Sequence, residues 1–204
     1  RDLVRLKTDI DLPKDWSNWR LHPPDREALL SLFAECGFHR FADQLRTENL
    51  PNEKVEWTSD YRPVVDEAGF DTFMKELAQQ KRISFDLETT SVHPAEAEIV
   101  GYAISWEPGV AYYVAVRAPK GETALKPDVV LSALQPIIEN PAVEKVGQNL
   151  KYDMVVLLRA GVHLLGLAFD TMIASYLLEP GERNHNLDEL AQRLLQHETI
   201  KIDS

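Results

Sequence analysis

Three short apolar segments follow one another in the middle of the chain, and they constrain its fold more than any other feature. They are residues 82–87, 98–105 and 110–116, each of the length of a β-strand. Pro108 and Gly109 form a turn signal between the second and third segments. Three neighbouring strands of this kind predict a β-sheet at the centre of the domain.

Helical patterns dominate the second half of the chain. Apolar residues recur at helical spacing within residues 127–139, and a short strand at 144–146 precedes a longer helix at about 149–160. Further helices are expected near 171–178 and 187–196. Strands followed by helices that alternate with a strand predict an α/β domain with a mixed sheet.

Composition divides the chain into three parts. Residues 47–68 are polar and have no sustained apolar period, which is typical of a linker. Before them, Asp25 is expected to cap a short helix that ends at Gly37, within a small partial domain at residues 1–46. After them, residues 69–204 carry the α/β pattern.

The charge of the chain restricts its partners. A formal net charge of −11 over 204 residues argues against a broad basic face that coats duplex DNA or an anionic membrane. It leaves open a local site in which carboxylates hold metal cations. The single cysteine, Cys36, excludes an internal disulfide and favours a cytoplasmic setting. Because Cys36 falls on the apolar side of a helical pattern, it is expected to be a core residue.

Two carboxylates come at the end of the first strand. Asp86 and Glu88 stand two positions apart, so they project from one side of the strand about 7 Å from each other. Asp153 lies one turn into the helix that begins at Asn149, where the helix dipole alone also favours an acid. A strand-end pair that faces a helix carboxylate can hold two Mg²⁺ or Mn²⁺ ions about 3.5–4 Å apart, as phosphoryl-transfer sites require.

Four segments make a family recognisable, in the order SFDLETTSV, EPGVAYYVAV, VGQNLKYD and LAFDTM. Together they resemble the proofreading 3′–5′ exonuclease domain of bacterial family A DNA polymerases, over about residues 69–204. Residues 1–46 resemble the tail of the 5′-nuclease domain that precedes it in those enzymes. The resemblance implies a ribonuclease H-like fold, a mixed central sheet flanked by helices, and the release of mononucleotides from a DNA 3′ end.

The resemblance also implies roles for individual residues. Asp86 would bridge two divalent ions, Glu88 would ligate the ion that activates water, and Asp153 would bind the other ion. Val92 stands where the family more often has leucine, so its wedge beside an unstacked base is expected to be weaker. The residues expected to contact the 3′-terminal nucleotides are Thr89, Val92, Gln148, Asn149 and Tyr152.

One motif of the family does not occur in these 204 residues. The third motif, Tyr-x-x-x-Asp, supplies another metal ligand and a hydroxyl that orients the attacking water, yet none of the six tyrosines has an aspartate four positions later. The motif and the polymerase domain are therefore expected beyond Ser204. The chain by itself is expected to bind metal weakly and to cleave DNA poorly.

Two other functions share these features. An RNA-trimming exonuclease of the ribonuclease D kind has the same fold and carboxylates, and some polymerases of this family keep the fold as a non-catalytic spacer. The EPGVAYYVAV segment and the 5′-nuclease-like start favour the polymerase, and the presence of Asp86, Glu88 and Asp153 counts against the spacer. The expected partners are a single-stranded or frayed DNA 3′ end and a polymerase domain of the same chain, in a monomeric protein.

Several residues near the end of the chain are interpreted as structural. Asp170 is expected to cap the helix that begins at Thr171 rather than to bind metal. An apolar stripe on that helix has the spacing of a core face. It comprises Met172, Ile173, Tyr176 and Leu177.

Overall fold

The computed structural model divides the chain into two compact units, Arg1–Glu53 and Lys54–Ser204. The residues that it describes are 6–9, 11, 20, 23–38, 41, 42, 44, 45 and 59–200. Residues 47–58 of the predicted linker therefore lie outside the described residues. Within the described part of the chain, no helix has both the length and the apolar character that crossing a membrane requires.

The first unit contains helix α1, Arg26–Glu35, which begins and ends where the sequence predicts. The Asp25 side chain accepts a hydrogen bond from Ala28 N at 3.1 Å, and Gly37 takes a left-handed backbone with φ of 69° just after the helix. The prediction that Cys36 is a core residue is wrong, because its side chain is exposed. Phe33, Phe38 and Phe41 pack their rings against one another, but α1 itself has no buried residue, so the apolar side on which Cys36 falls does not face a core.

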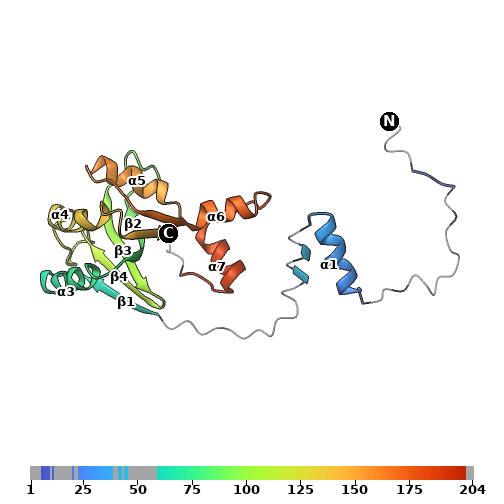
Figure 1. Ribbon diagram of the computed structural model, residues 1–204, viewed down its shortest axis with the longest axis horizontal. Helices are drawn as coiled ribbons and strands as arrows, with labels where there is room; N and C mark the ends of the chain where they lie inside the picture. The colour runs from blue at the N-terminus through green and yellow to red at the C-terminus, as the bar shows by residue number, and fades with distance from the viewer. Residues whose placement is uncertain are drawn as a thin grey trace. The chain divides into compact units, whose positions relative to one another are not determined.

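The second unit contains a six-stranded sheet in the order β1-β4-β3-β2-β5-β6. Strand β3 runs antiparallel to β2 and β4, while β1 is parallel to β4, and β2, β5 and β6 are parallel to one another. The mixed sheet that the sequence predicts is confirmed (Figure 1). The strands are β1 (Asp60–Val64), β2 (Arg82–Thr89), β3 (Ile99–Glu107), β4 (Val110–Ala115), β5 (Glu144–Gly147) and β6 (Leu167–Asp170).

Five helices accompany the sheet, and those predicted in the second half of the chain are present. They are α3 (Glu67–Leu77), α4 (Pro127–Ile138), α5 (Leu150–Arg159), α6 (Thr171–Leu178) and α7 (Leu187–Leu195). Figure 1 shows α3 and α4 beside one face of the sheet. The α/β architecture expected from the sequence, a mixed central sheet flanked by helices, is therefore the observed one.

The alternation of β2 determines which side chains reach the core. Ile83, Phe85 and Leu87 are buried, whereas Asp86 and Glu88 point to the opposite face and are exposed. We call this second face, which carries Asp86 and Glu88, the acid face. The helices contribute buried residues to the core on the other face, among them Phe73, Leu77, Val130, Leu134, Ile138 and Leu157.

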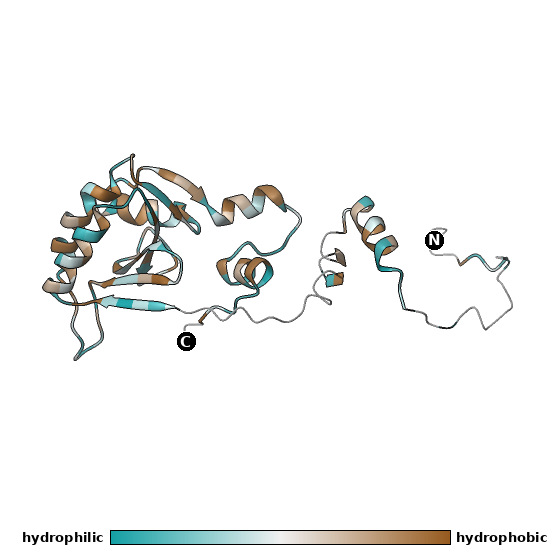
Figure 2. Cartoon of the chain, turned by 60° about the horizontal axis from the view of Figure 1, so that its bottom comes forward, coloured by the Kyte–Doolittle hydropathy of each residue, from teal (hydrophilic) through white to brown (hydrophobic). Residues whose placement is uncertain are grey.

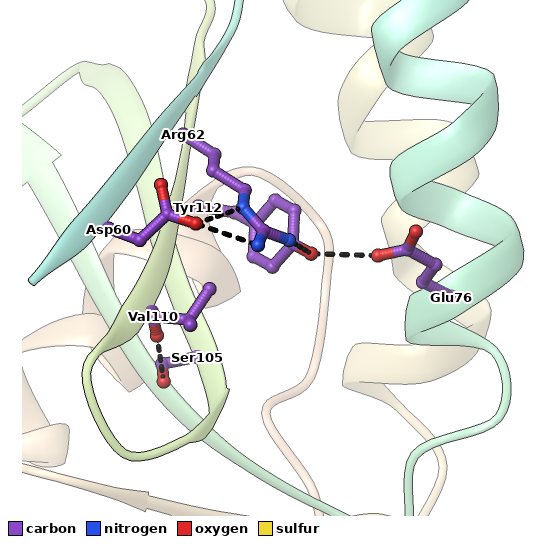
Figure 3. A network of polar contacts seen from close by, with 6 residues as sticks. All are labelled: Asp60, Arg62, Glu76, Ser105, Val110 and Tyr112. Atoms are coloured by element: carbon purple, nitrogen blue, oxygen red, sulfur yellow. Dashed lines mark hydrogen bonds and ion pairs between the residues drawn. The ribbon is translucent and has the colours of Figure 1, made fainter.

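Strand β1 lies inside the range 47–68 that composition assigned to a linker, so the sheet begins earlier than predicted, at Asp60. Polar contacts support its pairing with β4 (Figure 3). Because these contacts involve polar side chains, the sequence of β1 shows no apolar repeat. The Arg62 guanidinium donates a hydrogen bond to the Tyr112 hydroxyl at 2.6 Å and forms an ion pair with Asp60 at 2.7 Å. Tyr112 in turn donates to the Glu76 carboxylate on α3 at 2.7 Å.

The apolar stripe predicted as a core face of α6 is not buried. Ile173 is 55% exposed, Tyr176 60% and Leu177 77%, while Met172 is half-buried. Figure 2 shows the predominantly apolar residues of this helix. Helical spacing correctly predicted the helix, but α6 follows the edge strand β6, and Ser175 is its single buried residue in the structure.

Gly166, which precedes β6, provides a test of this architecture. Its φ is 74°, and a Cβ would overlap Val143 O and lie 3.1 Å from Pro141 O. Gly161 also has a positive φ, 81°, but a Cβ there has open space. We expect Gly161→Ala to cost about 1 kcal/mol of unfolding free energy, from backbone strain alone, and Gly166→Ala about 3 kcal/mol, measured by urea denaturation. Equal decreases in unfolding free energy would show that the close carbonyl oxygens around Gly166 do not add to the cost of the substitution.

Candidate active site

The acid face ends in two neighbouring carboxylates on β2. Asp86 and Glu88 lie opposite Ala103 and Gly101 of β3 in the antiparallel register. Both β3 residues are small, so neither of their own side chains reaches over the two acids. The strand register shifts between Glu88 and Thr89, which pairs with Ile99, so a bulge interrupts the ladder directly after the second acid.

Asp153 reaches this strand end from helix α5. Its side chain is 2% exposed, and its Oδ1 accepts a hydrogen bond at 2.9 Å from the backbone N–H of Leu87. Leu87 stands between Asp86 and Glu88, so the bond brings the helix carboxylate to the segment that holds the strand pair. Residues separated by 66 positions in the sequence thereby share one end of the sheet.

The three carboxylates affect one another electrostatically. Burial raises the pKa of Asp153 to about 7, and the negative charge of Asp86 adds to the shift. Partial loss of hydration also raises the pKa of Asp86 to about 6, although its side chain still reaches solvent, and the charge of Glu88 contributes further. Water reaches Asp86 on the acid face and screens its charge, so Asp153 carries the larger effect on stability. A cation between these groups would relieve the repulsion.

The donor chemistry fits a hard divalent cation, because carboxylate oxygens are the ligands that Mg²⁺ and Mn²⁺ prefer. Among the described residues, no three His, Cys, Asp or Glu side chains are gathered closely enough to enclose one ion. Such ions commonly keep several waters and use substrate phosphate as a ligand, so an open arrangement of acids is compatible with them. The candidate ligands are Asp86, Glu88 and Asp153.

A groove of about 460 Å³ lies beside the acids. Four of the five residues predicted to contact a nucleic acid end line it, namely Thr89, Val92, Asn149 and Tyr152. Val92 is 84% exposed, which leaves its side chain available to a ligand. The other lining residues are Leu87, Glu88, Thr90 and Ser91.

Tyr152 fixes the wall of this groove. Its hydroxyl donates to the Ser91 carbonyl and forms a short hydrogen bond with the Thr89 hydroxyl. These bonds join the loop after β2 to α5, the helix that carries Asp153. Thr89 and Tyr152 therefore both line the groove and are hydrogen-bonded to each other.

Gln148, the fifth predicted contact residue, does not line the groove. Its Nε2 donates to the His185 carbonyl at 2.8 Å, and its Oε1 accepts a hydrogen bond from the Thr171 hydroxyl. The amide thus connects the end of β5 to α6 and to the segment before α7. The structure separates Gln148 from the four residues that do line the groove.

Asp170 organises the start of α5, a role that the sequence analysis missed. Asn149 occupies the N-cap position of α5, but its backbone is left-handed, with φ of 56°, and its side chain makes no capping bond. Asp170 instead accepts hydrogen bonds from Asn149 N at 3.1 Å and Leu150 N at 2.7 Å. The predicted cap of α6 is confirmed, because Asp170 also accepts from Met172 N and Ile173 N.

One carboxylate therefore accepts four backbone N–H groups from two helix starts. An aspartate directly before a helix is a readable signal for the cap of α6. Nothing local in the sequence indicates the bonds to α5, because they join residues about twenty positions apart.

Comparison with known proteins gives one family for this chain. The family model described as 3′–5′ exonuclease of DNA polymerase A matches residues 61–204. DNA polymerase I of Pseudomonas aeruginosa is 36% identical over 98% of this chain, which corresponds to 23% of that protein. The chain thus spans about a quarter of the length of this curated relative.

Solved structures agree on the fold. The POL domain of Pol1 from M. smegmatis, in complex with DNA primer-template and dNTP, has a TM-score of 0.55 and 26% identity, and the match covers 68% of this chain and 23% of that one. Trypanosoma brucei RNase D in complex with RNA U12 has a TM-score of 0.57 at 14% identity, with 70% of this chain and 49% of that one covered. At that identity the second likeness concerns the fold alone.

The double cap predicts an unusual cost for removing Asp170. We expect Asp170→Ala to lower the unfolding free energy by about 2–4 kcal/mol, because four N–H groups at the starts of two helices, three of them in partly buried bonds, lose their acceptor. Asp66, which caps α3 through a single bond to Gly69 N, is the matched control, and Asp66→Ala should cost about 1 kcal/mol. Urea denaturation measures the unfolding free energy of both variants. Similar decreases in the two variants would contradict a role of Asp170 in capping two helices.

The raised pKa of Asp153 predicts a pH dependence of stability. A carboxyl that binds its proton more tightly in the folded chain than in the unfolded chain stabilises the fold at low pH. That contribution is lost as the pH rises from about 4 through the folded pKa of about 7. We expect Asp153→Asn to flatten this decline and to stabilise the cation-free protein at pH 7.5 by about 1–3 kcal/mol, because the amide oxygen can still accept from Leu87 N.

Urea unfolding at pH 4.5 and 7.5 in the presence of a chelator measures this effect. Asp71→Asn, at an exposed carboxylate on α3, is the matched control and should leave the difference between the two pH values unchanged. A less stable Asp153→Asn variant at pH 7.5 would show that the ionised carboxylate stabilises the fold.

Proposed function

Because the chain belongs to the 3′–5′ exonuclease family of DNA polymerase A, we propose that it removes nucleotides one at a time from the 3′ end of DNA and releases nucleoside monophosphates. The observation that carries the proposal is the bond from Leu87 N to Asp153, which puts a buried carboxylate beside the Asp86 and Glu88 pair at the edge of a groove. This arrangement suits hydrolysis of a phosphodiester assisted by divalent cations.

In this proposal the three carboxylates hold Mg²⁺ or Mn²⁺. Two such ions, when bound, supply an activated water and the positive charge that stabilises in-line displacement at phosphorus. The charge of Glu88 acts on Asp86, and the charge of Asp86 acts on Asp153. Asp86 therefore interacts with both other acids, which would suit a ligand shared by both ions. Glu88 would then hold the ion that supplies the activated water, and Asp153 would hold the other ion.

The groove receives the end of the strand. Exposed Val92 and the aromatic ring of Tyr152 offer apolar contact to an unstacked base, while Thr89 and Asn149 offer polar contacts to sugar or phosphate. Gln148 has a supporting part here, because its amide holds the segment around His185 near the start of α5. A site that takes an unstacked base accepts a single-stranded or frayed end more readily than a paired one.

The chain spans about a quarter of its Pseudomonas relative, and we propose that it acts as the proofreading segment of a DNA polymerase I-type enzyme. Residues 1–46 then form the tail of a 5′-nuclease domain, with a linker before the sheet. The first strand of the sheet begins at Asp60, before residue 69, where the sequence analysis placed the start of this domain. The polymerase domain of the same protein is the proposed partner, in a monomer, and the lone cysteine supports a cytoplasmic setting.

RNA trimming is the second candidate, supported by the likeness in fold to the Trypanosoma RNase D. A fold of this kind serves both substrates, so the choice depends on the relatives. The Pseudomonas DNA polymerase I is far more similar in sequence than the RNase D, and DNA is therefore the proposed substrate. The three acids argue against a non-catalytic spacer.

Substrate and metal dependence can be tested on 5′-labelled oligonucleotides. With Mn²⁺, we expect slow but progressive shortening of single-stranded DNA from its 3′ end, still slower shortening of a blunt duplex, and no reaction with a chelator. Asp86→Asn should abolish the reaction, since it removes the proposed shared ligand, while the matched control Asp71→Asn should retain it.

Three outcomes of that experiment would contradict the proposal. Cleavage that survives chelation would exclude the metal mechanism, and equal rates on single strand and duplex would exclude a site that requires an unstacked end. Faster shortening of RNA than of DNA would favour the ribonuclease D-like alternative.

A further inference from the structure

The acid face carries a tyrosine two strands away from the carboxylates. In the sheet register, Ala103 of β3 lies between Asp86 of β2 and Tyr113 of β4. In the next row, Gly101 lies opposite Glu88. Because residues in one cross-strand row share a face, Tyr113 stands on the same face as the acids, separated from them by small residues.

The Tyr113 ring does not stand upright in its own row but leans across Gly101. A Cβ built on Gly101 would lie 2.6 Å from Tyr113 Cε2 and would overlap Cζ and the hydroxyl oxygen. The hydroxyl end of the ring therefore lies over the residue that pairs with Glu88. Gly101 is not among the glycines with positive φ, so the backbone does not require glycine there, and the ring does.

The electrostatics agree with this placement. The pKa of Tyr113 is raised by burial and, next, by the negative charge of Glu88. A tyrosine phenol, with an ordinary pKa of about 10, is protonated at neutral pH and can donate to a carboxylate. Its neighbour Tyr112 points to the other face, where its hydroxyl is engaged by Arg62 and Glu76 (Figure 3). The side chains of Tyr112 and Tyr113 thus lie on opposite faces of the sheet.

We propose that Tyr113 is a positioning residue of the site, whose hydroxyl donates a hydrogen bond to the Glu88 carboxylate when a cation is bound and fixes the orientation of that carboxylate toward the ion. Gly101 provides the room that the ring needs to reach Glu88. The inference rests on the proposed function, in which Glu88 is a metal ligand. Tyr113 itself touches neither metal nor substrate in this role and acts through Glu88.

A double-mutant cycle tests this role through Mn²⁺ affinity, measured by isothermal titration calorimetry on the 204-residue chain. Tyr113→Phe keeps the ring and removes the hydroxyl, and we expect it to weaken Mn²⁺ binding on the order of tenfold, the effect of one hydrogen bond to a charged group. In a Glu88→Gln background the same change should have almost no effect. Gly101→Ala, which displaces the ring, should reproduce the loss.

Tyr61→Phe is the matched control, because Tyr61 is 61% exposed on the edge strand β1, and it should leave Mn²⁺ affinity unchanged. Thermal unfolding shows whether each variant remains folded. If Gly101→Ala does not fold, the comparison of Tyr113→Phe with the wild type still tests the inference. Unchanged affinity in Tyr113→Phe, or an equal loss with and without Glu88, would overturn the inference while leaving the proposed function intact. A wild-type chain that binds no Mn²⁺ would overturn both.

Discussion

The hydrogen bond from Leu87 N to the buried carboxylate of Asp153 is the interaction on which the site depends. It requires helix α5 to lie against the end of β2 and puts one negative charge beside two others. A buried acid with carboxylate neighbours loses hydration and gains repulsion, and the raised pKa of Asp153 reflects both effects. The fold thus keeps an unfavourable buried charge at the place where a bound cation would neutralise it, and such perturbed groups are common at functional sites.

Such an arrangement needs firm support, and Asp170 supplies it. By accepting N–H groups from the starts of α5 and α6, it satisfies donors that would otherwise be unpaired and holds Asn149 in its left-handed conformation. Tyr152 supports the site from the other side through the loop after β2. The acids therefore stand between two anchored segments, and the groove beside them has a defined wall.

The apolar side chains of α6 show where sequence periodicity stops being informative. A repeat of about 3.6 residues predicts a helix and a face, but not what that face will meet. Ile173, Tyr176 and Leu177 are exposed because α6 follows an edge strand. The same limit explains the error at Cys36, which lies on the apolar side of α1 but outside its small aromatic cluster.

The sequence by itself determined the alternation of β2, the common side of Asp86 and Glu88, the helices of the second half and the caps at Asp25 and Asp170, because pleat, helical repeat and capping are local properties. Only the tertiary structure decided the rest. The polar strand β1, the amide of Gln148 turned toward His185, the second helix capped by Asp170 and the ring of Tyr113 over Gly101 join residues far apart in the chain. Such contacts depend on how whole elements pack, and no local pattern encodes that packing.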